Sequence, residues 1–78
     1  MNNPRPLHEI AREIEKTWTK PYFGAVPYIQ AMRSLNTIND SFYADSAKSV
    51  VLYFLSNAAT WKGDDARRIK AELKNMVK

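Results

Sequence analysis

The chain has 78 residues, of which 45% are apolar and 26% charged, and a net charge of +4. This length supports one hydrophobic core rather than two, and the composition is typical of a soluble globular domain. The sequence contains no cysteine, which excludes disulfides, a thiolate nucleophile and cysteine-ligated zinc.

Neither end of the chain carries a targeting or membrane pattern. The first twenty residues contain prolines and glutamates but no apolar stretch like that of a signal peptide. The longest apolar run, residues 50–55, has six residues, far fewer than the roughly 20 that span a bilayer. We therefore expect a soluble, cytoplasmic protein, with a disordered lead-in over residues 1–5 and one domain over residues 6–78.

The first helix is predicted from Pro6 to about residue 20, because Pro21 cannot continue it. Its apolar residues fall within about 100° of one another on a helical wheel. They are Leu7, Ile10, Ala11, Ile14 and Trp18. We expect this face to enter the core. The glutamates opposite it are expected to pair along the helix with Arg12 and Lys16.

A second, short helix is predicted from Pro27 to about Asn36, after a connector that contains two aromatic residues and a glycine. Its predicted inner face consists of Tyr28, Ala31, Met32 and Leu35. Residues 36–44 are rich in Asn, Asp, Ser and Thr, which favour turns.

The third helix, predicted over about residues 46–59, is apolar on well over half of its surface. A helix that is apolar nearly all round is usually a buried one. Asp45 or Ser46 would cap its start. We therefore expect an all-α fold, a single small domain of four helices packed around this apolar third helix.

The fourth helix is predicted to begin after Gly63, with Asp64 and Asp65 in its first turn, where carboxylates oppose the helix dipole. Arg68 is expected to pair with Glu72 one turn later. The predicted inner face consists of Ala66, Ile69, Leu73, Met76 and Val77.

Residues suited to catalysis are scarce. His8 is the single histidine, and two glycines, Gly24 and Gly63, do not make a phosphate-binding loop. The pair Glu9 and Glu13 is better explained by salt bridges along a solvated helix face than by a metal site. We therefore expect no enzymatic activity, no cofactor and no metal.

Four basic residues of the fourth helix lie within about 80° of one another, beside its apolar face. They are Arg67, Lys70, Lys74 and Lys78. The row could meet an acidic protein surface or the phosphates of a nucleic acid, or it could be only a solvated face. A helix-turn-helix that reads base sequence is disfavoured, because the exposed residues suit phosphates better than base edges.

Three aromatic residues lie in the predicted connectors, namely Tyr22, Phe23 and Trp61. Such residues most often close the ends of a small core. Where they are exposed, tyrosine and tryptophan are common anchors of protein interfaces. Both interpretations are open for these three positions.

The segments Tyr22-Phe23-Gly24-Ala25 and Asp45 to Trp61 give the chain a resemblance that extends from about residue 7 onward. It resembles small uncharacterised proteins encoded by bacteria and their phages or prophages. The resemblance implies an intracellular setting and a role as an accessory protein that acts by binding. It supplies no functional residues.

The leading functional hypothesis is a non-catalytic accessory protein that binds a protein partner with an acidic or mixed surface. The candidate contacts are the basic row on the fourth helix and the three connector aromatics. One alternative is a nucleic-acid-binding protein that uses the same row on phosphates. Another is a structural homodimer that uses apolar surface left on the second helix.

Overall fold

The computed structural model describes residues 5–78, and this range confirms the expectation of a small, mostly helical domain. The elements are, in chain order, α1 (Leu7–Thr17), the 3₁₀ turn η1 (Phe23–Ala25), α2 (Val26–Met32), β1 (Ser41–Phe42), β2 (Asp45–Ser46), α3 (Ala47–Ser56) and α4 (Asp64–Met76). Most of the expected lead-in, residues 1–4, lies outside the described residues.

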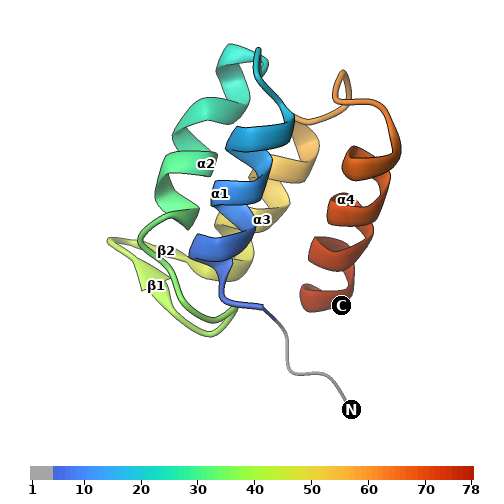
Figure 1. Ribbon diagram of the computed structural model, residues 1–78. Coiled ribbons are helices and arrows are strands. Elements are labelled where there is room, and N and C mark those ends of the chain that lie inside the picture. The colour runs from blue at the N-terminus through green and yellow to red at the C-terminus, as the bar shows by residue number, and fades with distance from the viewer. Residues whose placement is uncertain (1–4) are drawn as a thin grey trace.

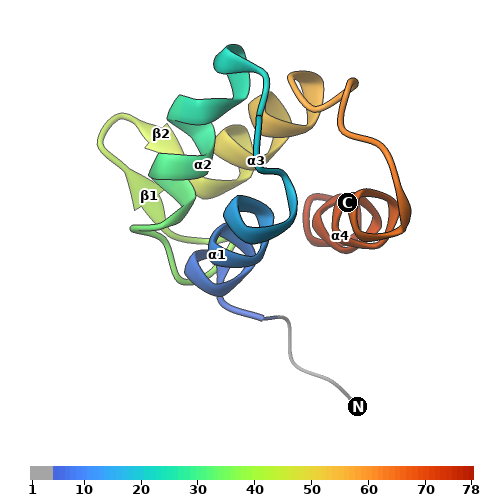
Figure 2. The same ribbon diagram turned by 45° about the horizontal axis from the view of Figure 1, so that its top comes forward.

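The helices run in alternating directions, so the connections that follow α1 and α3 lie at one end and the hairpin at the other (Figure 1). Each helix packs most closely against two others: α1 and α3 both contact α2 and α4. Buried side chains from α1, α2, α3 and α4 form one core cluster, and the turned view shows how these helices are grouped (Figure 2). No polar or charged side chain of residues 5–78 is buried in that core. In the described part of the chain, every helix is too short or too polar to cross a bilayer.

An aromatic cluster closes the end of the core at the connections after α1 and α3. The rings of Trp18 and Trp61 are stacked with centroids 5.2 Å apart. Phe54 meets both indoles edge-on, with centroids at 6.3 Å. All three side chains are buried, which confirms the prediction that Trp18 belongs to the core.

The start of α1 is tied to the segment after α2. The Leu7 and His8 N–H groups, which have no partner inside their own helix, donate to the carbonyls of Asn36 and Leu35 over 2.9 and 3.0 Å. These bonds replace a side-chain cap at Pro6. They also fix the segment after α2 against α1.

Both α1 and α2 end earlier than the sequence predicted. α1 ends at Thr17, because Trp18 leaves helical geometry (φ −109°, ψ 83°) as its indole turns into the core. α2 ends at Met32, and a turn closed by the bond from the Leu35 N–H to the Met32 carbonyl brings Leu35 into the core. In both places core packing decides where the helix stops.

α3 is only partly enclosed. Val51 and Phe54 are completely buried, whereas Leu52 is 44% and Tyr53 51% exposed. The sequence pattern predicted burial nearly all round, but neighbouring helices leave one side of α3 open. Ser46 caps the start as predicted, because its hydroxyl accepts the Ser49 N–H over 3.1 Å. The helix ends at Ser56, three residues before the predicted end.

A short antiparallel hairpin occupies part of the region that was predicted to contain only turns. Ser41 lies opposite Ser46, and Phe42 lies opposite Asp45. Tyr43, at the tip, has a φ of 54° and is 91% exposed. Positive φ is costly for a residue with a β-carbon, so the hairpin holds Tyr43 in a strained conformation.

Candidate functional site

α4 divides its residues among three faces. The inner face consists of the buried residues Ala66, Ile69 and Leu73. The edge toward α1 carries Asp65, Arg68 and Glu72. The edge toward the α3–α4 connection carries Arg67, Lys70 and Lys74. Most of the helix's acidic groups therefore face α1, while the basic row lies on the other side.

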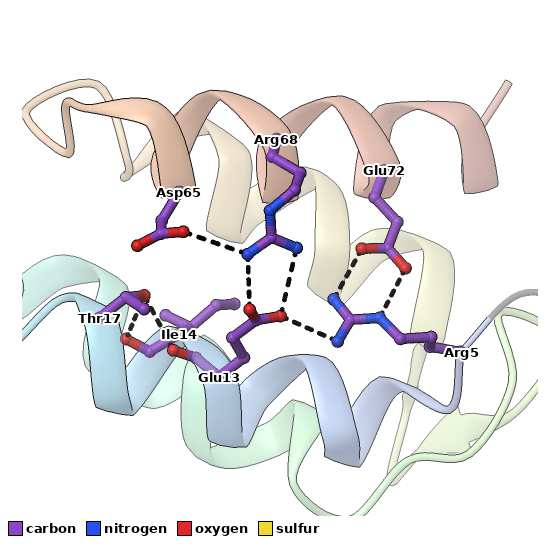
Figure 3. A network of polar contacts seen from close by, with 7 residues as sticks. All are labelled: Arg5, Glu13, Ile14, Thr17, Asp65, Arg68 and Glu72. Carbon is purple, nitrogen blue, oxygen red and sulfur yellow. Dashed lines mark hydrogen bonds and ion pairs between the residues drawn. The ribbon is translucent and has the colours of Figure 1, made fainter.

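A network of ion pairs joins α4 to α1 and to the residue before Pro6 (Figure 3). The guanidinium of Arg5 binds both carboxylate oxygens of Glu72 over 2.9 and 2.7 Å and reaches Glu13 over 2.8 Å. Arg68 also binds Glu13, and it contacts Asp65 over 3.2 Å. The bond from Arg68 is the main cause that holds the pKa of Glu13 below its ordinary value.

This network corrects three sequence-based expectations. Arg68 does not pair with Glu72, because its guanidinium is already bound to Glu13 and Asp65. Glu13 pairs across helices rather than along α1. Arg5, which was assigned to a disordered lead-in, is held in place by two carboxylates.

A hollow of about 340 Å³ lies beside the basic edge of α4 and contains no acidic side chain in its lining. Its lining consists of Trp61, Lys62, Gly63, Ala66, Arg67, Lys70, Ala71 and Lys74. We call this feature the basic hollow. It brings together four of the predicted site residues and adds one charged residue that was not predicted, Lys62.

Lys70 forms the inner wall of the basic hollow. Its ammonium donates to the Ala58 carbonyl over 2.7 Å, and that carbonyl also accepts the Trp61 N–H over 3.1 Å. Burial lowers the pKa of Lys70 from its ordinary value, and the nearby charges of Lys62 and Lys74 lower it further. The ammonium groups of Lys62 and Lys74 therefore both lie close enough to that of Lys70 to repel it.

The other predicted basic residues differ in their surroundings. Arg67 is largely exposed and lies 3.6 Å from the carboxylate of Asp64. Lys62, Lys70 and Lys74 form no ion pair with any residue of the 5–78 range. Lys78 follows the end of α4 and does not line the hollow.

The three predicted aromatics lie in two kinds of environment. Trp61 is 4% exposed, so most of its ring contacts the core and only an edge lines the hollow. Tyr22 and Phe23 are 45% and 79% exposed, with ring centroids 4.8 Å apart. A β-carbon on Gly24 would lie 2.6 Å from the Tyr22 ring, so glycine there allows that ring to fold back.

Residues of the connection between α3 and α4 line both the basic hollow and a depression beside Tyr22. Tyr22 lines a small depression of about 100 Å³ together with Ser56, Asn57, Ala59 and Thr60. The hollow begins at Trp61 in the same connection. A partner that covers this connection could therefore contact both surfaces.

Sequence reasoning missed Lys62, because it lies before α4 and outside the helical period that revealed the row. Its position next to Trp61 was the available signal. It also missed the pair Tyr28 and Tyr53, whose rings lie 5.5 Å apart across α2 and α3. No group of three His, Asp or Glu side chains in the described range is arranged to hold a metal ion.

No protein-family model, curated protein or solved structure matches this chain.

Proposed function

We propose that this protein is a non-catalytic interaction module that binds an acidic surface of a partner protein through the basic hollow. The observation that carries the proposal is the concentration of Lys62, Arg67, Lys70 and Lys74 around one concavity that no acidic side chain lines. A phage or prophage origin, which the resemblance of the sequence implies, remains part of this proposal.

The separation of charges on α4 supports the proposal. The carboxylates of Asp65 and Glu72 are bound by arginines on the side toward α1. The ammonium groups of Lys62 and Lys74 therefore remain available for an external anion.

The exposed aromatics extend the proposed contact. Tyr22 lies beside the α3–α4 connection that also lines the hollow, and Phe23 packs against Tyr22. Both are exposed, and aromatic residues are enriched in protein interfaces. We propose that they contact the rim of the partner. Trp61 forms part of the buried lining of the hollow, and its ring face packs in the core rather than contacting the partner.

Two variants with the same net charge test the basic hollow. The test variant is Lys62→Glu/Arg67→Glu/Lys74→Glu, and the control is Arg12→Glu/Lys20→Glu/Lys48→Glu, at exposed positions elsewhere. Each reversal removes two units of charge, so both variants carry −2 instead of +4. Affinity capture from host lysate, with and without nuclease and followed by mass spectrometry, should lose the partner with the test variant only.

The outcome separates the proposal from its alternatives. Capture that is equal for wild type and test variant would contradict a role for the hollow. A partner that disappears after nuclease treatment would favour nucleic acid. In that case binding to a DNA duplex should weaken with salt, with a log–log slope of roughly −3 to −4 for three or four phosphates.

A further inference from the structure

The basic hollow combines an apolar floor with a cationic rim. The apolar residues of its lining are Trp61 and Ala66, which are buried and form its floor, and Ala71, which is exposed. The cations Lys62, Arg67 and Lys74 surround this apolar surface. A purely electrostatic site would not need a concave apolar floor.

The size of the hollow is sufficient for an inserted side chain. Its volume of about 340 Å³ lies within the range of pockets that enclose small ligands, about 300–1,000 Å³. One side chain of a partner can therefore enter it. A phosphate backbone runs along a surface and has no apolar group to place in such a hollow.

Resting on the proposed function, we infer that the hollow receives one apolar side chain of the partner, flanked in the partner's sequence by carboxylates that pair with the rim. The ligand class is thus an acidic peptide segment with a central apolar residue. Burial of the apolar side chain provides affinity, and the carboxylates determine its orientation.

Lys70 gives the inner wall a fixed positive charge. Its bond to the Ala58 carbonyl holds the ammonium in the hollow that Lys62 and Lys74 also line, before any ligand arrives. A carboxylate that binds there offsets the repulsion of this ammonium by those of Lys62 and Lys74. A cation that is already in position also loses less conformational freedom on binding than a freely rotating lysine.

Two peptides of equal charge test the inference on the full chain. One is acetyl-Glu-Glu-Leu-Glu-Glu-amide, and the other has serine in place of leucine. Binding is followed by NMR shifts of the Gly63, Ala66 and Ala71 amides at about 50 mM salt, where screening is weak. We expect the leucine peptide to bind about tenfold more tightly, because it alone buries an apolar side chain.

Filling the hollow provides a second measurement. Ala71→Leu places a larger apolar group at its side and should abolish the preference for the leucine peptide. Ala44→Leu, at an exposed position in the hairpin, is the matched control and should retain that preference. Because both alanines are exposed, neither variant is expected to unfold the domain.

Each result bears on the inference. Equal affinities for the two peptides, or no shift of the three amides with either peptide at millimolar concentration, would overturn it. Tighter binding of a short DNA duplex than of the leucine peptide would also overturn it, in favour of phosphate. The proposed function has its own test: it is contradicted if the variant Lys62→Glu/Arg67→Glu/Lys74→Glu still captures the same partner proteins.

Discussion

The indole rings of Trp18 and Trp61 lie 5.2 Å apart and within 9° of parallel. They join the segment after α1 to the segment before α4, two parts of the chain that are distant in sequence. Because Trp61 is next to Lys62, this stack also fixes the place where the basic hollow begins. Core packing and the candidate site are therefore connected at one residue.

Trp61→Ala should destabilise the domain by about 3–5 kcal/mol, because it removes a buried aromatic side chain and leaves a cavity. A domain of this size has a total stability of roughly 4–12 kcal/mol, so the variant should be largely unfolded at mild urea concentrations. Urea titration followed by circular dichroism measures the effect. Phe23→Ala, at a 79% exposed position, should change stability by less than about 0.5 kcal/mol; an equal loss in both variants would contradict the packing described.

Glu13→Gln should weaken the contact between α1 and α4, because Glu13 accepts bonds from both Arg5 and Arg68. Both arginines are over a third exposed, so screening limits the cost to about 1 kcal/mol. The loss should shrink at high salt. Glu9→Gln, at an exposed position, serves as the control in the same urea titrations; a salt-independent loss for Glu13→Gln would argue against an ionic contribution.

Acid should destabilise the protein through two carboxylates. The Arg68 bond lowers the pKa of Glu13 from its ordinary 4.5, and the Thr37 and Asn36 N–H groups lower the pKa of Asp40 from 3.8. A carboxyl group whose pKa is lower in the folded state than in the unfolded state stabilises the fold at any pH above its unfolded-state pKa. This stabilisation is lost as the pH falls through the folded-state pKa. The melting temperature should therefore decrease as the pH is lowered below about 4.5. In the double variant Glu13→Gln/Asp40→Asn, the melting temperature should depend less on pH in this range. An unchanged slope in the double variant would assign the acid sensitivity to other groups.

Replacing Tyr43 should reveal the strain at the hairpin tip. Asparagine tolerates a positive φ better than valine does, and both replacements remove the contact with Phe42. We therefore expect Tyr43→Asn to be more stable than Tyr43→Val by about 1 kcal/mol. Thermal unfolding of the two variants measures the difference. Equal stabilities would show that the φ of 54° carries no cost.

Lys70→Met should destabilise the fold by about 1 kcal/mol, because it removes the bond to the Ala58 carbonyl. The cost is moderate, since that carbonyl keeps the Trp61 N–H as a partner. Lys74→Met should leave stability nearly unchanged. Urea titrations of the two variants distinguish these roles, and equal effects would mean that Lys70 is no more structural than Lys74.

The features predicted correctly from the sequence depend on local signals. Gly63 has the positive φ expected at the start of α4, and Asp64 begins the helix as the dipole argument required. The inner face of that helix was also predicted correctly at Ala66, Ile69 and Leu73. Capping preferences and helical periodicity act within a few residues, so one sequence contains enough information for them.

The features that were missed depend on contacts between distant residues. Arg5 binds Glu72, which is 67 positions away, and no periodicity indicates such a pair. α2 stops early because Leu35 enters the core, which depends on the placement of α1. In the candidate site, the row on α4 was found from its spacing, but Lys62 joins it only through the fold of the α3–α4 connection.

The separation of charge on α4 also has a kinetic consequence. With Asp65 and Glu72 bound on the side toward α1 and the lysine ammonium groups on the other side, charge is distributed unevenly across this helix. The acidic surface of a partner will orient the approaching domain so that Lys62 and Lys74 face that surface. This orientation raises the association rate constant. Added salt should therefore slow association more than it speeds dissociation.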